Sequence, residues 1–319
     1  MLRRYLPSVV ANTRGEGVEI VVADNGSTDS SRDVLCNEFP SVRMIELDRN
    51  YGFAEGYNRA LAETDSTYTV LLNSDVEVTA GWLLPLLDYM DSNPSVAAVQ
   101  PKILSDTDRK RFEHAGAAGG YLDALGYPFC RGRIVGYTAE DRGQYDMPAD
   151  VLWTSGACMC VRTDIYKRVG GLDAAFFAHM EEIDFCWRLN CRGYRLVCLP
   201  KSKVYHLGGG ALNYESPRKT YLNFRNNLLM LYKNLPARYL LWVLLVRFFL
   251  DYVAALQLLL TGKPANAWAA VKARLDYRRM KPQMKAAREE NMRLAKVSYP
   301  PTICRRSVIW DYYIRQKRQ

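Results

Sequence analysis

Apolar and polar positions alternate along the first third of the chain in a pattern typical of strands followed by helices. Residues 18–24 (VEIVVAD) form a short β-branched run, and turn formers and helix-capping residues open a helical pattern in residues 25–39. Further strands are predicted at residues 42–47 and 67–72, and further helices at residues 50–64 and 80–94. This alternation predicts an α/β fold with a doubly wound, parallel sheet.

Carboxylates follow two of these predicted strands. Asp24 ends the first run, and the third strand leads directly into Asn73, Ser74 and Asp75. In doubly wound sheets, ligands bind outside the carboxyl ends of the strands. We therefore expect both carboxylates to line a crevice at one edge of the sheet.

A third acidic cluster lies in residues 176–188 (FFAHMEEIDFCWR), where Glu181, Glu182 and Asp184 stand beside aromatic residues. The flanking segments TSGACMCVR and VGGLDAAFF are apolar and rich in small residues. Acids in such surroundings are typical of a partly enclosed site, whereas acids of a solvated helix face have polar neighbours.

The composition changes after residue 235. Residues 218–236 are basic with aromatic residues between the charges, residues 240–260 are almost wholly apolar, and residues 263–290 are basic and helical in pattern. The apolar stretch is long enough to span a bilayer, but Arg247 and Asp251 within it argue against a simple span and are spaced to pair with each other. We predict a helix lying in the membrane plane, with a buried helical hairpin as the alternative. The expected units are therefore a catalytic domain at 1–235 and a helical, basic, membrane-associated region at 236–319.

The net charge and the cysteine content further limit which binding partners and which compartment we expect. The 319 residues carry a net charge of +9 and are 49% hydrophobic, which suits a folded protein with a phosphate-bearing partner such as a nucleotide or anionic lipid. Nucleic acid is not expected, because no recognised nucleic-acid motif accompanies the basic tail. The 8 cysteines form no CxxC pair, so we expect reduced thiols in a cytosolic compartment and no zinc site. The N-terminal residues do not resemble a signal peptide.

Six segments in order resemble the family 2 glycosyltransferases with a GT-A fold, most closely the bacterial rhamnosyltransferase-like members. They are VVADNGSTDSS, NYGFAEGYNRAL, LLNSDVEV, TSGACMCVR with GGLDAAFF, EEIDFCWR and VYHLGGGA. The resemblance implies a mixed, mostly parallel sheet. It also implies inverting transfer of a sugar from a nucleoside-diphosphate donor, with dTDP-rhamnose as one candidate, to a hydroxyl of a glycan or lipid-linked saccharide. The expected place is the cytoplasmic face of a bacterial membrane, in the synthesis of cell-surface polysaccharide or lipid-linked glycan.

The resemblance also implies a divalent metal, Mg²⁺ or Mn²⁺, at Asp75 and His206. A nucleoside diphosphate leaves readily once its charge is neutralised, and hard oxygen ligands suit these ions. Family members usually carry Asp-x-Asp where this chain has Asn73-Ser74-Asp75, so the first position offers only a neutral oxygen. An ordinary buried or surface histidine is the alternative for His206.

The resemblance to the family also predicts which residues contact the sugar donor. The resemblance assigns nucleotide or sugar binding to ten residues, some of which also fit a plain turn or a packing role. These residues are Asp24, Asn25, Ser27, Asp29, Gly52, Asn58, Asn73, Gly156, Trp187 and Arg188.

The catalytic base is expected among Glu181, Glu182 and Asp184. Inverting transfer needs one carboxylate to accept the proton of the attacking hydroxyl. The family pattern Glu-Asp-x-Asp has the base at its second position, which is Glu182 here. Asp184 stands four residues before Arg188, so an ion pair between them is expected if the segment is helical.

One expected element is missing from the sequence. Family members begin with an apolar strand in the middle of the sheet, and this chain starts with the helical pattern LRRYLPSVV. We expect that strand to be encoded upstream of Met1 or to have been removed. A catalytically silent glycosyltransferase-like binding or scaffold protein is the alternative function. A nucleotidyltransferase is disfavoured because no glycine-rich, lysine-bearing phosphate loop occurs near the N-terminus.

Overall fold

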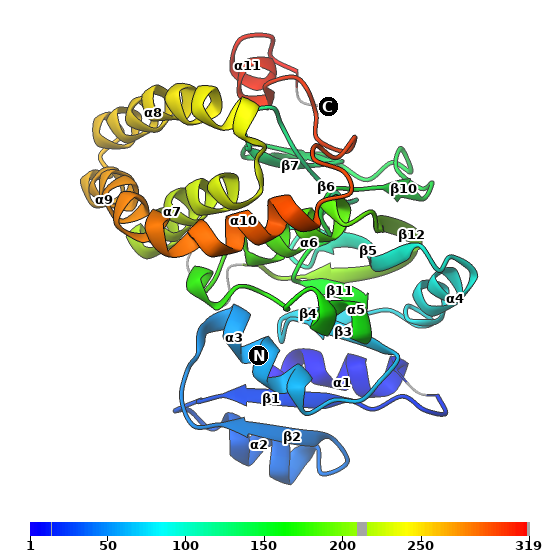
Figure 1. Cartoon of the computed structure of the whole chain (residues 1–319). Coiled ribbons are helices and arrows are strands. Elements are labelled where there is room, and N and C mark those ends of the chain that lie inside the picture. Colours follow the sequence, from blue (N-terminus) through cyan, green and yellow to red (C-terminus); the bar gives the residue numbers. More distant parts are fainter. Residues whose placement is uncertain (14, 209–215, 318–319) are drawn as a thin grey trace.

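The computed structural model describes residues 1–13, 15–208 and 216–317 (Figure 1). Every strand and helix predicted in the first third of the chain is present, with bounds shifted by a few residues. The elements of this part are α1 (Leu2–Asn12), β1 (Val21–Asn25), α2 (Ser31–Glu38), β2 (Arg43–Leu47), α3 (Gly52–Ala62), β3 (Tyr68–Leu72), β4 (Val76–Val78) and α4 (Leu84–Ser92).

The main sheet is built around a buried central strand. Its order is β10–β12–β5–β11–β3, and β4 pairs with β12 beside this path. Nine of the ten residues of β5 are buried, because helices or other strands cover both of its faces. The strands that complete this sheet are β5 (Val96–Ser105), β10 (Ala149–Asp150), β11 (Cys158–Arg162) and β12 (Arg195–His206).

The sheet is mixed, as the family resemblance implies, and contains both parallel and antiparallel pairs. Parallel pairing occurs between β1 and β2 and between β5 and β12. In the main sheet, β11 runs antiparallel to both β3 and β5, and β4 and β10 run antiparallel to β12. Parallel neighbours need a helical crossover. Between β5 and β11 the chain instead forms a small antiparallel sheet of β6 (Gly120–Leu122), β7 (Pro128–Cys130), β8 (Arg133–Ile134) and β9 (Tyr137–Thr138).

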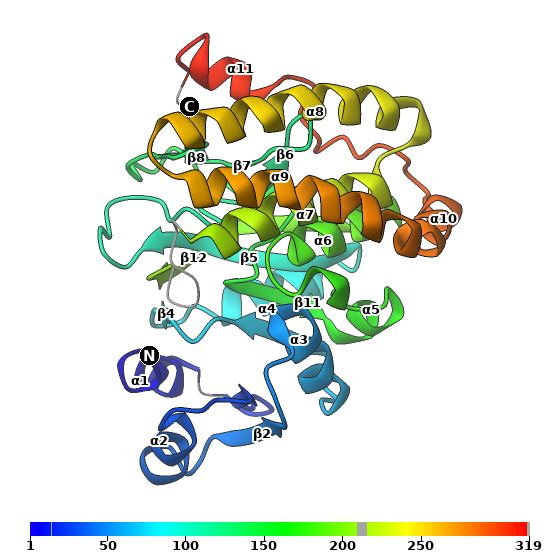
Figure 2. The ribbon, with the colours of Figure 1, turned by 90° about the vertical axis from the view of Figure 1, so that its left-hand side faces the viewer.

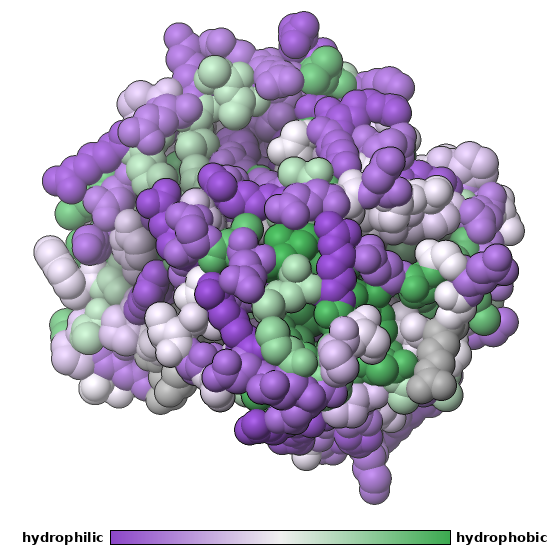
Figure 3. All heavy atoms as spheres, turned by 90° about the horizontal axis from the view of Figure 1, so that it is seen from below, coloured by the Kyte–Doolittle hydropathy of each residue, from purple (hydrophilic) through white to green (hydrophobic). Residues whose placement is uncertain are grey.

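The first two strands stand apart from the rest of the sheet. β1 pairs only with β2 in the part of the chain that the structure describes, and β3 is the edge of the main sheet. A crevice between them is lined by apolar residues of α1, β1, α3 and β3. Viewed from the side of α2 and β2, hydrophobic residues are visible in a hollow between hydrophilic rims (Figure 3). The family resemblance places its further strand in the middle of the sheet, and that strand stays a prediction.

The chain after β12 is helical, as predicted. α7 packs against α6 and α9, and α8 packs along α9 (Figures 1 and 2). The helices of the second half of the chain are α5 (Thr163–Arg168), α6 (Glu181–Cys191), α7 (Pro217–Asn234), α8 (Ala237–Leu260), α9 (Pro264–Met280), α10 (Lys285–Leu294) and α11 (Val308–Tyr313), with short 3₁₀ turns at Ala174–Phe176 and Lys281–Met284.

The predicted ion pair within α8 is confirmed. Arg247 Nε lies 3.1 Å from Asp251 Oδ1, and Arg274 Nη1 of α9 lies 2.5 Å from Asp251 Oδ2. Arg247 also donates to the carbonyl of Leu125 at 3.1 Å and stacks over Tyr127. These contacts tie the middle of α8 to the α/β body, so its charged side faces inward.

The opposite side of α8 is apolar and exposed. Leu241 is 81% exposed, Phe249 62% and Leu260 77%. The helix is long and apolar enough to cross a membrane, with a mean hydropathy of 2.0 in its most apolar window, of which 22% is buried. A hairpin buried on all sides, the alternative to a membrane-plane helix, is therefore wrong for this helix.

Candidate functional site

A crevice of about 1,700 Å³ runs from the apolar gap beside β1 to a polar end at the carboxyl ends of β3 and β12. Its polar end is lined by Asp75, His206, Glu181 and Glu182. These four side chains come from distant parts of the sequence. The fold therefore brings together the proposed metal ligands and two of the three candidate bases.

Asp75 and His206 meet because their strands pair. Val76, the first residue of β4, is the register partner of His206 at the end of β12, so the residue before Val76 stands beside the histidine. Asp75 Oδ1 lies 3.1 Å from His206 Nε2. On the other side of the ring, His206 Nδ1 lies 3.4 Å from Glu113 Oε2. The imidazole is thus flanked by two buried carboxylates.

This arrangement changes the protonation of all three groups. Burial opposes the charged form of His206, but Asp75 and Glu113 outweigh it and raise its pKa to about 9. Burial likewise works against ionisation of both carboxyls, and the adjacent imidazole nevertheless holds the pKa of Asp75 and of Glu113 below the ordinary values. Within residues 1–13, 15–208 and 216–317, no group of three histidine, cysteine or acidic side chains is arranged so that all three could hold one metal ion.

Glu181 and Glu182 are the first two residues of α6. Glu181 is 3% exposed, and neither its Oε2 nor that of Glu182 has a hydrogen-bond partner among the described residues. Burial raises the pKa of Glu182 to about 7. Burial and the neighbouring Glu182 charge raise the pKa of Glu181 well above its ordinary value. A carboxyl with such a pKa and an open oxygen can accept a proton near neutral pH.

Asp184, in contrast to Glu181 and Glu182, is surrounded by hydrogen-bond donors. It is fully buried and accepts hydrogen bonds from Arg188 Nε at 3.0 Å, Lys233 Nζ at 2.8 Å and Asn234 Nδ2 at 2.8 Å. Burial opposes its ionisation, but Lys233 and Arg188 lower its pKa below the ordinary value. The predicted pairing with Arg188 is confirmed. Asp184 is outside the crevice wall, so its candidacy as the base is corrected to a structural role.

Four of the ten residues expected to bind the donor line the crevice, namely Asn25, Gly52, Asn73 and Gly156. Asn25 Oδ1 also accepts from the backbone nitrogen of Tyr51 at 2.9 Å, next to Gly52.

 Gly52 has a positive φ of 79°, and a Cβ there would stand 2.6 Å from Phe177, so a side chain does not fit. A Cβ on Gly156 would stand 3.0 Å from Phe53 and 3.8 Å from Glu182, so this glycine keeps the wall open beside the candidate base.

The turn after β1 is held together by its own side chains. Asp24 is 4% exposed, accepts from the backbone of Ser27 at 3.1 Å and pairs with Arg32. Asp29 Oδ1 accepts from the backbone of Ser31 at 3.0 Å. Asp24, Ser27 and Asp29 are outside the crevice wall, and their contact with a nucleotide stays a prediction.

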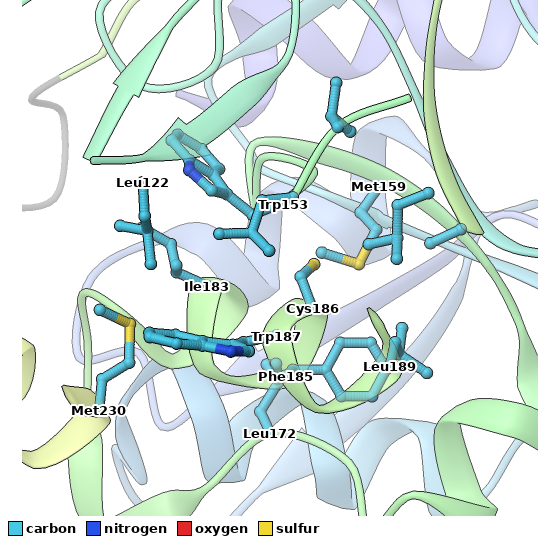
Figure 4. Close-up of a cluster of buried hydrophobic side chains, with 14 of the residues drawn as sticks. Leu122, Trp153, Met159, Leu172, Ile183, Phe185, Cys186, Trp187, Leu189 and Met230 are labelled. Atoms are coloured by element: carbon cyan, nitrogen blue, oxygen red, sulfur yellow. The ribbon is translucent and has the colours of Figure 1, made fainter. Parts of the chain in front are cut away.

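Three predicted donor contacts are corrected by the burial or the hydrogen bonds of these side chains. Trp187 is 1% exposed and lies in the apolar core beside Met230 and Ile183, so it cannot stack on a sugar (Figure 4). Arg188 donates to the carbonyls of Val169 at 2.7 Å and Gly171 at 2.6 Å as well as to Asp184.

Asn58 is the third of these residues. Its Nδ2 donates to the carbonyl of Leu172 at 2.7 Å, and its Oδ1 accepts from Tyr166 Oη at 2.7 Å and from the backbone of Leu172 at 3.0 Å. The amide thus joins α3 to the loop after α5, its oxygen accepts two hydrogen bonds, and Asn58 is outside the crevice wall.

The sequence analysis did not identify two residues that contact the candidate site or the loop leading into it. Glu113 stands beside His206 although 93 positions separate them, and no local motif marks it. Asn226 of α7 contacts the loop that precedes Glu181. Its sequence signal is the polar run Arg225-Asn226-Asn227 within the basic and aromatic helical pattern.

Comparison with known proteins identifies what this chain resembles. A model of the family described as Glycosyl transferase family 2 matches residues 1–167. An N-acetylglucosaminyl-diphospho-decaprenol L-rhamnosyltransferase of Mycobacterium tuberculosis is 29% identical over 222 residues, which are 64% of this chain and 71% of that enzyme. The rhamnosyltransferase WbbL of Escherichia coli is 26% identical, over 61% of this chain and 75% of that enzyme.

Solved structures resemble the fold. The structure of GalNAc-T7 with UDP, GalNAc and Mn²⁺ has a TM-score of 0.59 at 15% identity, over 99% of this chain and 54% of that one. The mannosyltransferase PcManGT from Pyrobaculum calidifontis, solved with GDP-Man and Mn²⁺, has a TM-score of 0.51 at 15% identity, over 91% and 83%. At this identity the likeness establishes the GT-A fold alone.

The contrast between Glu182 and Asp184 predicts opposite effects on stability. The raised pKa of Glu182 means that its stabilising contribution is present below about pH 4.5 and is lost as pH rises through about 7. Glu182→Gln should therefore raise the free energy of unfolding at pH 8 by about 1 to 3 kcal/mol, with a smaller difference at pH 5. Asp184→Asn should lower it by about 3 to 5 kcal/mol, because Lys233 and Arg188 lose their charged partner.

Urea unfolding of the two variants and the parent at pH 5 and pH 8 measures these differences. Equal destabilisation by both substitutions at pH 8 would contradict the assignment of different environments to the two acids.

Proposed function

We propose that this chain, which belongs to glycosyl transferase family 2 and is a glycosyltransferase of glycan synthesis, transfers a sugar with inversion at the anomeric carbon. Glu182 is the proposed base. The donor is a nucleoside-diphosphate hexose, and the acceptor is a hydroxyl of a glycan or lipid-linked saccharide. The observation that carries the proposal is the carboxyl of Glu182, whose buried Oε2 has no hydrogen-bond partner among the described residues and which lines the same crevice as the Asp75–His206 pair.

The chemistry follows from these positions. In a single displacement, the acceptor oxygen attacks the anomeric carbon while a carboxylate takes its proton. Glu182 has an oxygen without a partner among the described residues and a raised pKa, whereas both oxygens of Asp184 already accept hydrogen bonds. Glu182 is longer by one methylene than the aspartate that is usual in the family, and Gly156 leaves room for it beside the wall.

A divalent cation fits the other end of the crevice. Neighbouring ligands of an octahedral ion at about 2.1 Å are about 3 Å apart, and Asp75 Oδ1 and His206 Nε2 are separated by 3.1 Å. Glu113 on Nδ1 would keep Nε2 directed toward the ion, as carboxylates often do for histidine ligands. We propose that Asp75 and His206 bind Mg²⁺ or Mn²⁺, which supplies charge neutralisation for the leaving diphosphate when bound.

The relatives favour a deoxyhexose donor. Two of the similar enzymes are named as rhamnosyltransferases, so we propose dTDP-rhamnose as the first donor to test. Asn25, Gly52, Asn73 and Gly156 would form the donor wall.

The outward face of α8 is proposed as a membrane contact. Its apolar side is exposed, and α11 beside it adds Trp310, Tyr313 and Ile314, which are each more than half exposed (Figures 1 and 2). A membrane-crossing orientation is disfavoured, because Arg247 at the middle of α8 contacts the α/β body and would draw it into the bilayer. The region 236–319 would thus hold the catalytic domain at the cytoplasmic face of the membrane, near lipid-linked acceptors.

The first test of this function is transfer by the parent and by Glu182→Gln. A panel of nucleotide sugars that includes dTDP-rhamnose should give turnover of at least one donor. Glu182→Gln should lower the transfer rate by about 10² to 10⁴ with donor binding little changed, because it keeps the size and removes the base. The parent rate should rise with pH through about 7, where Glu182 loses its proton.

No turnover of any donor would favour the alternative of a catalytically silent binding or scaffold protein. Near-parent rates for Glu182→Gln, together with a folded but inactive Asp184→Asn, would move the base to Asp184.

The metal proposal predicts graded losses of ion binding. Asp75→Ala should abolish Mn²⁺ binding in the presence of nucleoside diphosphate, and Glu113→Gln should weaken it about tenfold by releasing the ring of His206. Electron paramagnetic resonance of free Mn²⁺ measures both without any need for activity. His114→Ala, which removes another histidine that lines the crevice, should leave Mn²⁺ binding unchanged and serves as the control.

Undiminished transfer by the parent in excess chelator would rule out the metal proposal while leaving the role of Glu182 open to its own test.

The membrane proposal predicts binding to lipid vesicles that high salt weakens only in part. Screening removes the attraction of lysine and arginine to anionic lipid, but apolar burial remains. Phe249→Glu combined with Leu256→Glu should reduce the bound fraction at least about tenfold, since each apolar side chain contributes about 1.5 to 3 kcal/mol on burial. Leu84→Glu on α4, where Leu84 is 64% exposed, is the matched control and should bind normally.

Co-sedimentation with vesicles of phosphatidylcholine and phosphatidylglycerol measures the bound fraction. A parent protein that stays wholly in the supernatant at low salt would refute the membrane contact.

A further inference from the structure

The segment immediately before α6 has an unusual backbone. Phe177 has a φ of 66°, His179 of 69° and Met180 of 73°, and none of the three is a glycine. Side chains at positive φ crowd their own backbone, so such residues persist only where the surroundings hold them. Glu181 and Glu182 follow directly, and their direction is therefore set by this strained segment.

One side chain of α7 holds the segment from one side. Asn226 is fully buried, and its Nδ2 donates to the carbonyl oxygens of Phe176 at 2.9 Å, Ala178 at 2.8 Å and His179 at 2.7 Å. Arg225 Nε donates to Asn226 Oδ1 at 2.8 Å, which fixes the orientation of the amide, because only an oxygen can accept there. The nitrogen of the amide must then face the three carbonyls.

α3 holds the same segment from the other side. The carbonyl of Phe177 accepts from the backbone nitrogens of Phe53 at 2.7 Å and Ala54 at 3.3 Å. Gly52 before them is fixed by Asn25, whose Nδ2 donates to its carbonyl at 2.8 Å. The strained segment is thus clamped between the turn of the proposed donor wall and α7.

We propose that Asn226 is a positioning residue for Glu182, which it aims at the crevice by holding the segment Phe177–Met180 in its conformation, with positive φ at Phe177, His179 and Met180. The inference rests on the proposed function, in which Glu182 is the base. Asn226 itself is not among the crevice-lining residues and touches no reacting group. A purely stabilising role would change the amount of folded protein, whereas a positioning role changes the rate of each folded molecule.

The test compares Asn226→Ala with Asn190→Ala. Asn190 is a matched control, since it is also a buried asparagine that donates to two backbone carbonyls, Leu152 at 2.9 Å and Cys186 at 2.9 Å, with no contact to the segment. Asn226→Ala should lower kcat about 10- to 100-fold, because a displacement of roughly 1 Å costs about that much, with the donor KM changed less than about threefold. Its pH profile of kcat should also shift, while that of Asn190→Ala should match the parent.

Hydrogen exchange gives a readout that needs no activity. Amides of residues 177–182 should exchange at least about tenfold faster in Asn226→Ala than in Asn190→Ala when both are compared with the parent at equal global stability. Asn226→Asp, which keeps the size but sets an oxygen against three carbonyls, should give the same pattern.

These measurements distinguish a failure of the positioning role of Asn226 from a failure of the proposed function. Parent-like kcat and parent-like exchange in Asn226→Ala would overturn the positioning role, as would equal losses of kcat in both variants. A parent that transfers no sugar would refute the proposed function instead, and the exchange of residues 177–182 would then decide alone whether Asn226 holds the segment.

Discussion

The buried carboxylate of Asp184 is the contact on which the arrangement of the catalytic half depends. It accepts hydrogen bonds from Arg188 in its own helix and from Lys233 and Asn234 at the end of α7. Lys233 also reaches Asp173 in the loop after α5, and Asn234 accepts from Asn291 of α10. A fully buried charge is tolerated only when its partners are fixed, so α6, α7, α10 and the loop must come together as a unit. The helix that begins with Glu181 and Glu182 is oriented by this unit.

Two acids only two residues apart consequently have different chemistry. Side chains two apart on a helix do not face the same way, so Asp184 points into the cationic contacts and Glu182 points into the crevice. Cationic partners lower the pKa of the first, and burial without partners raises that of the second. The fold thus stabilises itself through one carboxylate and leaves the adjacent one costly to ionise, a state that a proton-accepting group requires.

Local pattern predicted those features that depend on neighbours in the sequence. The early strands and helices, the Asp184–Arg188 and Arg247–Asp251 pairs and the approach of Asp75 to His206 follow from periodicity, four-residue spacing or an ordered set of motifs. Features set by distant contacts were missed or misassigned. Trp187 looked available for stacking because the sequence does not show that α6 is covered on nearly every side. Glu113 and Asn226 gain their roles only when β5, β12 and α7 come together.

The central position of β5 has a consequence for synthesis of the chain. Its partners in the sheet are β11, whose pairing joins Val99 to Cys160, and β12, whose pairing begins at Val96 and Arg195. The ribosome makes these partners about 60 and about 100 residues later, which corresponds to several seconds at roughly 5 to 20 residues per second. Throughout that interval a strand that is almost wholly buried in the folded protein has both edges unpaired, the condition under which nascent chains aggregate or recruit chaperones. The yield of folded protein should accordingly depend on the tempo of translation between these strands.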